Sequence, residues 1–499
     1  MATEASFDLV TRNWIPVRWV AGSTNTDTVL GLRNVLHHAH EIETLKFGPP
    51  PALSALYRVL YALAARVTGL DGSGEDDWDD LRDKWLDEGR LDKDEVDRYF
   101  AEHPRRFDLF GERPFLQDPR LRAQCPKPSG LNKLVFGRPA GNNHVWFGHH
   151  RDADPRPLDA EEAVAHLLMW IYYGPSGRCS SRTAGAITAA DVSAGPLRGA
   201  LSYHPEGATL FHTLMAGLIP PARFLEVETD QCPWEKEHLT DPEMPPPATP
   251  GPCSRWTDVG QHALLLVPDA TGTRVVDAYA TWAFRDKRPR TDPYLIWQIS
   301  QAGNPYARPA DSGRALWRDI DALLLKDPLG SNQARRPAVF DTVYEADDTE
   351  ALRVRALGFE QDGKTKDVQY VSGTTPAILD LLKPGERHRA REIGTLRVAG
   401  EAYGFRVTLA VKRAWATILN EKIGPCAWAE EAAALYWPEA EREFWSRMHE
   451  RSYEGAWRSF RVHAETVYDR VTARAPRTAA AARAIERARS TLYGGKRAA

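Results

Sequence analysis

The fold of this chain is indicated most clearly by two near-echoing phrases: Phe7-Asp8-Leu9-Val10-Thr11-Arg12-Asn13-Trp14-Ile15-Pro16-Val17 and Arg106-Phe107-Asp108-Leu109-Phe110-Gly111-Glu112-Arg113-Pro114-Phe115-Leu116-Gln117. We name them the first phrase and the second phrase. Alternation over Leu9 to Val17 predicts a short strand with Trp14 and Ile15 near its end. The second phrase carries apolar side chains that each stabilise the fold by roughly 1.5–3 kcal/mol when fully buried: Phe107, Leu109, Phe110, Phe115 and Leu116. Both phrases therefore predict core scaffold rather than chemistry.

Composition predicts a folded protein of several domains. The chain has 499 residues, enough for roughly two to four domains. Its hydrophobic content of 42% and charged content of 26% are ordinary for a globular protein. The 16 Trp residues favour some placement at interfaces. Because the net charge is −4, a nucleic-acid role would depend on local basic patches rather than on the total charge.

Cysteine usage and hydropathy predict a cytoplasmic protein. The five cysteines are scattered and form no C-x-x-C pair, so a reducing compartment fits best. We expect no signal peptide, because no basic segment precedes an apolar run at the N-terminus. We also expect no membrane span, since the best candidate, Pro51 to Leu70, contains Arg58 and Arg66.

The first three quarters of the chain predict a mixture of helices and strands. Leucines, tyrosines and alanines recur at three- and four-residue spacing over Pro51 to Leu70, which indicates an amphipathic helix. The acidic stretch Gly74 to Asp80 is interpreted as the solvated start of a further helix. Asp159 is expected to cap a helix that ends at Tyr173. The other predicted elements are a helix over Leu210–Leu218 and strands over Ala263–Val267, Arg274–Phe284 and Ala338–Tyr344.

The last quarter predicts helices alone. Helical spacing and abundant Ala, Leu, Glu and Arg continue from about Thr375. The predicted helices are Phe405–Asn420, Glu430–Arg451, Gly455–Thr472 and Thr478–Tyr493. Short connections between them favour an antiparallel bundle. We therefore predict an α+β protein, with a large mixed domain at 1–374 and a C-terminal antiparallel four-helix bundle at 375–499.

Enzyme motifs are absent from the sequence. It contains no phosphate-binding loop of the Walker type, no G-x-G-x-x-G after a strand, no H-E-x-x-H and no G-x-S-x-G. The adjacent pairs His37-His38 and His149-His150 point in different directions on a strand or helix, so each is interpreted as a polar loop feature. We expect no catalytic residues, no metal and no cofactor. A hydrolase that uses the loop histidines stays open as an alternative.

One loop has the composition of a nucleic-acid contact. Lys133 to Arg151 combines basic ends, glycines, two adjacent amides and two adjacent aromatics. Amide side chains can probe acceptors in a minor groove, and aromatic rings can stack or wedge against bases. The candidate contact residues are Lys133, Arg138, Asn142, Asn143, His144, Trp146 and Phe147. The alternative is a flexible loop whose aromatic side chains belong to the core.

The two phrases together resemble the CasA family, the large subunit of the type I-E CRISPR surveillance complex Cascade. The resemblance implies that Asn142 to Phe147 meets the DNA duplex at the protospacer-adjacent motif (PAM). It also implies a glycine loop that approaches the minor groove. The matching stretch is Gly174-Pro175-Ser176-Gly177-Arg178, with Gly174, Gly177 and Arg178 as candidates, and Ala194 to Gly199 also resembles the family. Some relatives bind zinc through two cysteine pairs, which this chain lacks.

The resemblance further implies a hairpin whose tip separates the DNA strands beside the PAM. Ala356 to Lys366 fits that position, and its candidate tip residues are Gln361, Asp362, Gly363 and Lys364. A plain polar hairpin turn is the alternative. The family's minor-groove lysine has no counterpart near Tyr279. Basic residues just beyond could contact the DNA backbone instead, with a solvated turn as the alternative: Arg285, Lys287, Arg288 and Arg290.

The function implied by the resemblance is recognition without catalysis. The protein would read the PAM in double-stranded DNA and start R-loop formation, so that guide RNA pairs with the target strand. The implied partners are double-stranded DNA, the guide RNA ribonucleoprotein, the other Cascade subunits and a helicase-nuclease, with no membrane. The basic end of the chain, residues 471–499, could lie along a nucleic-acid backbone or contact a partner subunit. A purely structural assembly subunit stays open as an alternative.

Overall fold

The computed structural model describes residues 5–72, 75–140, 148–221, 227–258, 260–286, 292–325, 334–343, 351–362 and 366–494, the side chains of residues 75 and 76 excepted. The chain divides into two compact units. Unit 1 comprises Met1–Ile296, Ala307–Ser312 and Pro337–Leu379, and unit 2 comprises Trp297–Tyr306, Gly313–Arg336 and Asp380–Ala499. The fold mixes helix and sheet, as the sequence predicts.

The two phrases lie directly against each other in unit 1. Leu9 N donates to Phe107 O, and Leu109 N donates to Phe7 O, each at 3.0 Å. The Asp108 carboxylate accepts a further hydrogen bond from Phe7 N at 3.0 Å, across 101 positions of sequence. Their likeness in sequence therefore corresponds to a reciprocal pairing of two short backbone segments, which no local pattern predicts.

Burial confirms the scaffold prediction for most of the second phrase. Phe107, Leu109, Phe110 and Phe115 are at most 7% exposed. Leu116 is the exception, because it is only half-buried and its backbone is left-handed, at φ 56°. A left-handed residue lies at a sharp turn of the chain, so this side chain was wrongly predicted to be core.

The first strand begins later than predicted. β1 comprises Ile15–Trp19 and pairs antiparallel with β2 (Val29–Leu30) and β3 (Ile42–Leu45). The residues before it form a turn in which the Asp8 carboxylate accepts from Thr11 Oγ1 at 2.6 Å. Such local hydrogen bonds offer the backbone an alternative to strand pairing.

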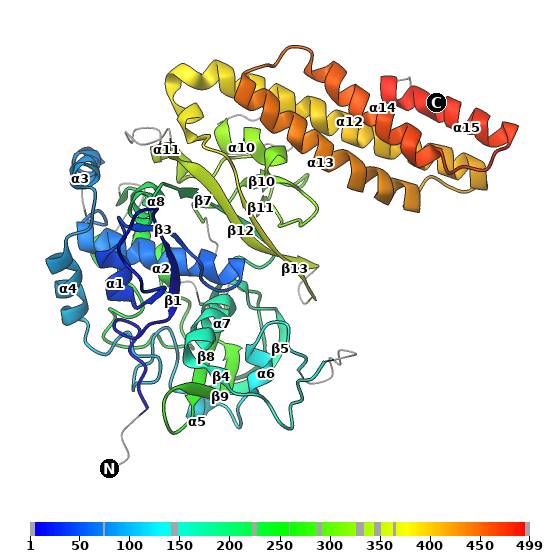
Figure 1. The fold of residues 1–499 in the computed structure, drawn as a ribbon. Helices are drawn as coiled ribbons and strands as arrows, with labels where there is room; N and C mark the ends of the chain where they lie inside the picture. The colour runs from blue at the N-terminus through cyan, green and yellow to red at the C-terminus, as the bar shows by residue number, and fades with distance from the viewer. Residues whose placement is uncertain are drawn as a thin grey trace. The chain divides into compact units, whose positions relative to one another are not determined.

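The helix predicted over Pro51–Leu70 is α2 (Pro50–Thr68) (Figure 1). It contacts α7 (Ala160–Tyr173), α9 (Pro252–Thr257) and β12 (Arg353–Asp362). Nearly every residue of α2 is buried, so the predicted amphipathic character is wrong. Its inward polar groups are paired instead of solvated. Arg58 is 1% exposed, donates from Nη1 to Ser54 Oγ at 2.8 Å and forms an ion pair with Asp292 at 2.8 Å.

The remaining helices of unit 1 follow the prediction in part. α7 (Ala160–Tyr173) and α8 (Leu210–Gly217) confirm two predicted helices, although the Asp159 side chain forms no cap hydrogen bond and pairs with Arg274 at 3.4 Å. The acidic stretch begins α3 (Glu75–Glu88). The others are α1 (Leu32–His37), α4 (Lys93–Glu102), α5 (Leu121–Gln124), α6 (Leu131–Leu134) and α9 (Pro252–Thr257).

Among the described residues of unit 1, three further sheets are present (Figure 1). The strands predicted over Ala263–Val267 and Arg274–Phe284 are confirmed. They are β8 (His262–Pro268) and β9 (Arg274–Trp282), which form one sheet with β4 (Leu158–Asp159) in the order β4-β9-β8. The second sheet pairs β5 (Gly177–Ala184) with β6 (Ile187–Val192). The third contains β7 (Leu201–Glu206), β12 (Arg353–Asp362) and β13 (Lys366–Thr374) in the order β13-β12-β7.

The strand predicted over Ala338–Tyr344 is wrong. The described part of this stretch forms a short helix, α11 (Phe340–Val343). Phe340 N donates to Pro337 O at 3.0 Å, which starts a helical turn. Phe340 and Val343, three residues apart, are both fully buried, as expected for one face of a helix.

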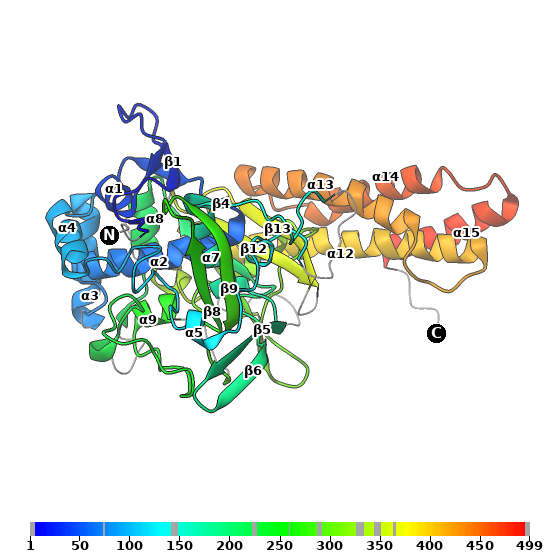
Figure 2. The same ribbon diagram turned by 90° about the horizontal axis from the view of Figure 1, so that it is seen from below.

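Unit 2 contains the predicted C-terminal helices, which lie side by side in both views (Figures 1 and 2). They are α12 (Arg387–Leu419), α13 (Ala427–Glu450), α14 (Ala456–Thr472) and α15 (Ala479–Arg489). α12 is 33 residues long and begins well before the predicted Phe405. It contacts each of the other three helices.

The core of unit 2 also depends on a segment from the middle of the chain. Trp317, on the 3-10 turn η3 (Leu316–Asp319) that precedes α10 (Ile320–Leu324), is completely buried. Its ring centroid lies 5.1 Å from that of Phe444 and 6.5 Å from that of Phe460. The sequence did not assign this segment to the helical unit.

Among the described residues, no helix is long and apolar enough to cross a membrane.

Candidate nucleic-acid interface

The glycine loop, Gly174 to Arg178, follows directly from α7. Gly174 N donates to Trp170 O at 3.1 Å, and Gly174 O accepts from Gly195 N at 2.9 Å. A Cβ atom at this position would lie 2.6 Å from His262 Cε1, so only glycine fits. Gly174 is therefore a packing residue of the loop, with both backbone groups already paired.

Two cationic residues lie next to each other at the exposed end of the glycine loop: Arg178 of the loop itself and Lys133 of α6. Gly177 has φ 117° and opens β5, and the next residue, Arg178, is exposed. Lys133 Nζ lies 3.4 Å from Arg178 O, which places α6 beside this strand. Among the described residues no acid forms an ion pair with Lys133 or Arg178. These two predicted site residues thus lie together and present positive charge to solvent.

A buried histidine that is not among the predicted site residues supports the glycine loop. His262 Nε2 donates to Pro175 O at 2.9 Å. Burial lowers the pKa of His262 to about 4, against the opposing effect of this hydrogen bond, so the ring is neutral near pH 7. A lone histidine at the start of an apolar strand gives no local signal of this role.

The connecting turn, Ala194 to Gly199, joins the glycine loop to the β12–β13 hairpin. Gly195 N binds the glycine loop at one end, as described above. At the other end Arg198, whose side chain is 4% exposed, forms an ion pair with Asp367 at 2.8 Å. Arg198 Nη2 also donates to Lys366 O at 3.3 Å. Three segments distant in sequence are therefore joined around one buried guanidinium.

Gln361 completes this connection at the end of β12. Its Oε1 accepts from Gly199 N at 2.8 Å, and its Nε2 donates to Asp367 Oδ1 at 2.7 Å. Asp362 is exposed and lies 3.6 Å from Lys366 Nζ across the hairpin. The hairpin prediction is confirmed for the described strands, with Gln361 still in β12. Gly363 and Lys364 lie outside the described residues.

The described flank of the Asn142 loop packs on the same hairpin. The Phe136 ring centroid lies 5.9 Å from that of Phe359 on β12 and 5.7 Å from that of Trp170 on α7. Arg138 Nη1 donates to Arg156 O at 2.9 Å, and burial lowers the pKa of Arg138. The candidates Asn142, Asn143, His144, Trp146 and Phe147 lie outside the described residues.

The basic run after β9 is held at both ends. Arg285 forms a two-pronged ion pair with Asp191 of β6, with Nη2 at 3.0 and 3.1 Å from the two carboxylate oxygens. Asp292 forms the ion pair with Arg58 of α2. Lys287 and Arg288, between these anchors, lie outside the described residues.

The hydrolase alternative gains no support from the described residues. The serine–histidine contact between Ser54 Oγ and His204 Nε2 measures 3.4 Å, and both side chains are completely buried. Burial lowers the pKa of His204 well below its ordinary value. Within the described ranges, no group of three or more His, Cys, Asp or Glu side chains could hold a metal ion.

The fold recurs in solved structures of CRISPR surveillance proteins. A structure described as a CRISPR RNA-guided surveillance complex contains a chain 41% identical, covering 98% of this chain and 99% of that one, with a TM-score of 0.89. A second, described as the same complex before nicking, is 40% identical with a TM-score of 0.81 and the same coverage. Thermobifida fusca Cse1 is 20% identical over 98% of both chains, with a TM-score of 0.80.

The family follows from a match along nearly the whole sequence. Residues 8–481 match the model of the CRISPR-associated protein Cse1 family, and this chain belongs to that family. Thermus thermophilus CasA (Cse1), 19% identical with a TM-score of 0.75 over 98% of this chain and 99% of that one, shares the fold. The resemblance to the CasA family drawn from the two phrases is thereby confirmed. No curated protein gives a significant sequence match.

Proposed function

We propose that this chain is the non-catalytic large subunit of an RNA-guided Cascade complex. It recognises the PAM in double-stranded DNA, starts duplex opening towards an R-loop, and helps recruit a helicase-nuclease in antiviral defence. Its partners are the guide RNA ribonucleoprotein and the other Cascade subunits, and its place is the cytoplasm. The family membership supports this proposal, as does the arrangement of the interface.

The observation that carries the proposal is the joining of the glycine loop to the hairpin. A hairpin that separates base pairs needs a firm base, because a loose one would yield before the duplex does. Here Gln361 is fixed to Gly199, and Arg198 is fixed to Asp367. The connecting turn that carries both contacts also holds Gly174 through Gly195. Groove contact and strand separation would thus act from one rigid support.

DNA would take over hydrogen bonds that are now made within the protein. The Gln361 amide would exchange Gly199 and Asp367 for base edges at the opened pair, while the ion pair between Arg198 and Asp367 keeps the hairpin joined to the connecting turn. Lys133 and Arg178 would bind the backbone phosphates beside the glycine loop, which gives affinity without sequence preference. The side chains of Asn142 and Asn143 would form hydrogen bonds with base edges in the minor groove, where most of the exposed polar groups are hydrogen-bond acceptors.

The helices α12–α15 would serve as the antiparallel four-helix bundle that contacts neighbouring subunits and the displaced strand. The basic end of unit 2 is partly neutralised, because Arg474 pairs with Glu431 at 3.1 Å and Arg489 pairs with Asp469. Three exposed arginines have no ion pair among the described residues and are the candidates for backbone contact: Arg477, Arg483 and Arg487.

A binding comparison on the assembled complex tests the proposal. The chain would be assembled with its guide ribonucleoprotein and offered a duplex with the PAM or with that motif scrambled. We expect Gln361→Ala, and the pair Asn142→Ala with Asn143→Ala, to reduce the preference for the PAM by about tenfold or more, the equivalent of 1.4 kcal/mol. Gln369→Ala, an exposed amide on β13 of the same hairpin, is the matched control.

The alternatives predict other outcomes in the same experiment. A purely structural subunit would assemble normally and bind both duplexes equally. A hydrolase would turn over ester or nucleotide substrates without any partner. Either result would contradict the proposal, provided that each variant retains its melting temperature.

A further inference from the structure

The second phrase forms one wall of a small cavity that the proposed function does not use. The cavity has a volume of about 150 Å³ and is lined by Phe115, Ile171, Trp234 and Phe284, together with Arg106 and Arg113. The same two arginines also line a wider adjoining cleft of about 970 Å³. His262, which supports the glycine loop, forms part of the small cavity as well. The cavity therefore lies immediately behind the proposed DNA contact.

Arg106 and Arg113 form a pair of like charges without a counterion. Within the described part of the chain, no carboxylate lies within ion-pair distance of either guanidinium. Arg113 Nη1 donates to the backbone oxygen of Glu237. Burial, and then repulsion from Arg106, lower the pKa of Arg113. Two half-buried guanidinium groups that line the same cavity favour a bound anion.

The buried acids of the small cavity are already committed to other cations. The Asp118 carboxylate accepts from Arg120 at 2.8 and 2.9 Å and from Arg182 at 2.7 Å. Asp258 forms an ion pair with Lys236 at 2.6 Å. Neither acid is therefore available to neutralise the arginine pair.

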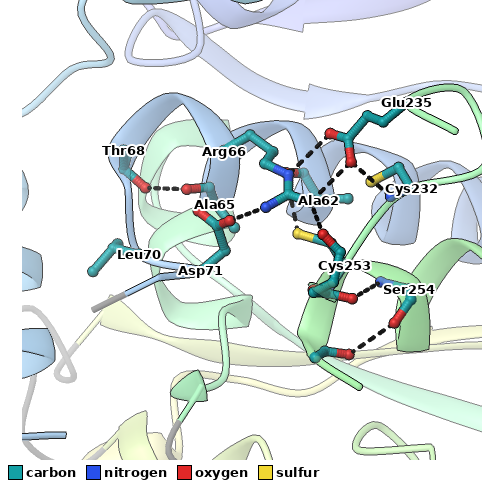
Figure 3. A network of polar contacts seen from close by, with 12 residues as sticks. Ala62, Ala65, Arg66, Thr68, Leu70, Asp71, Cys232, Glu235, Cys253 and Ser254 are labelled. Carbon is teal, nitrogen blue, oxygen red and sulfur yellow. Dashed lines mark hydrogen bonds and ion pairs between the residues drawn. The ribbon is translucent and has the colours of Figure 1, made fainter. Parts of the chain in front are cut away.

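A third acid nearby is held by α2, as Figure 3 shows. Glu235 accepts from Arg66 Nε at 2.9 Å and Nη2 at 2.8 Å, and from Tyr99 OH at 2.5 Å. Although burial acts to raise it, hydrogen bonds and charge from Arg66 lower the pKa of Glu235, which stays ionised. Because Cys232 N also donates to Glu235 at 2.7 Å, the cavity wall at Trp234 is fixed.

The backbone that presents the two arginines is unusual at both ends. Arg105 has φ 60° and Leu116 has φ 56°. The other two non-glycine residues with positive φ among the described ones, Asn420 and Arg451, are helix C-caps, where this conformation is common. Left-handed backbone at ordinary residues persists where the surrounding structure imposes it, and it clusters at binding sites.

These observations point to one class of ligand. We infer that Arg106 and Arg113 bind a phosphate of an unpaired nucleotide whose base enters the small cavity. A guanidinium group can donate two parallel hydrogen bonds to two oxygens of one phosphate. The negative charge of the phosphate would also neutralise the two arginines, which have no carboxylate partner among the described residues. The cavity of about 150 Å³ has aromatic walls at Phe115, Trp234 and Phe284 beside its polar groups, and it is large enough for one six-membered ring, such as that of a pyrimidine base. The site does not depend on PAM reading, and either single-stranded RNA or DNA would supply the nucleotide.

Binding of short labelled single strands to the full-length chain tests this inference. RNA and DNA of one sequence, in separate arms, identify which strand supplies the nucleotide. We expect Arg106→Gln combined with Arg113→Gln to weaken binding about tenfold or more, and to reduce the slope of log K against log salt by about 0.7, because the contact with one phosphate is lost. Arg122→Gln, an exposed arginine of α5 outside the cavity, is the matched control.

Two further measurements separate the base from the phosphate. UMP should compete for the site about five- to a hundredfold better than ribose 5-phosphate, because base stacking adds to phosphate binding. Glu112→Gln should strengthen binding, since it removes an exposed acid of the wider cleft. The inference is overturned if the double variant, with unchanged melting temperature, binds as the wild type does. It is also overturned if ribose 5-phosphate or polyglutamate competes as well as UMP.

Discussion

At the scale of single residues, the interface depends on side chains that are buried rather than displayed. Gly174 has no room for a Cβ atom, and His262 fills that space while donating to Pro175 O. Gln361 and Arg198 use their polar groups to hold backbone segments together. The residues with a role in recognition are therefore supported by residues whose role is positioning.

His262 should make the stability of the protein sensitive to acid. Its folded-state pKa is about 4 and its ordinary value is 6.5, so the unfolded chain binds the proton first as pH falls. Stability from this group is complete above pH 6.5 and is lost between pH 6.5 and 4. At about 1.4 kcal/mol for each unit of pKa, the loss is about 3 kcal/mol.

Urea unfolding at several pH values checks this expectation. His262→Gln should lower stability near pH 7, yet lose less than the wild type as the pH falls from 6.5 to 4. His204, whose pKa burial also lowers, is unchanged in both proteins and cancels in the comparison. Parallel curves for the two proteins would show that His262 does not titrate in this range.

At the scale of elements, the hairpin should depend on the ion pair between Arg198 and Asp367. Asp367→Ala leaves Arg198 buried without an acid and removes one partner of Gln361. Because Asp367 is partly exposed, we expect a cost of about 1–2 kcal/mol, less than for a fully buried pair. Hydrogen exchange at the amides of Gly199 and β13 should quicken accordingly.

Lys366→Ala is the control for this prediction. It breaks an ion pair with Asp362 in which both side chains are mostly exposed, 76% and 70%. Such a pair contributes less than about 1 kcal/mol, and its loss should leave exchange nearly unchanged. Equal effects of the two substitutions would contradict the special position of Asp367.

Replacing Gly400 of helix α12 by alanine should destabilise the protein, although alanine is the better helix former. Alanine in a helix interior normally stabilises by about 0.5–1 kcal/mol relative to glycine. At Gly400, however, a Cβ atom would lie 2.7 Å from the completely buried Trp317 ring. We expect Gly400→Ala to destabilise the protein by about 1–3 kcal/mol through overpacking.

Thermal and denaturant unfolding measure this effect. Gly385→Ala is the matched control, because a Cβ atom there meets nothing within 4 Å. Its free energy of unfolding should change by no more than about 0.5 kcal/mol. A stabilising Gly400→Ala would show that Trp317 can move aside.

At the scale of the whole molecule, unit 2 is assembled from three separate stretches of chain. Glu401 of α12 accepts from Arg314 at 2.9 Å and from Arg318 at 2.8 Å, while Arg397 of α12 pairs with Asp321 at 2.6 Å. The boundary predicted at 374/375 separates the helices from these partners. The helical unit is therefore defined by long-range packing rather than by one boundary in the sequence.

A fragment of residues 375–499 should consequently fold poorly alone. It lacks Trp317, so Phe444 and Phe460 would be exposed, and a core aromatic side chain contributes about 3–5 kcal/mol. We expect broad, weakly cooperative thermal unfolding by circular dichroism, sharpened when a peptide of residues 313–336 is added. Sharp unfolding of the fragment by itself, unaffected by the peptide, would contradict this expectation.

The sequence by itself determined the family and the regular elements. The two phrases identified the family, and the spacing of apolar residues located α2, α7, α8, β8, β9 and the C-terminal helices. These features depend on neighbours within a few turns of chain, where helical and strand periods are visible. The hairpin at Gln361 was located through the family resemblance, together with a turn signal in the sequence.

Only the tertiary structure decided which distant segments of the chain pack against each other. It paired Phe7 with Asp108, buried every side of α2, turned Ala338–Tyr344 into a helix and placed Trp317 among the C-terminal helices. It also joined the glycine loop to the hairpin through Arg198. Such contacts connect residues far apart in sequence, and packing and ion pairing choose between them only after the chain has folded. Local periodicity therefore carries no information about them.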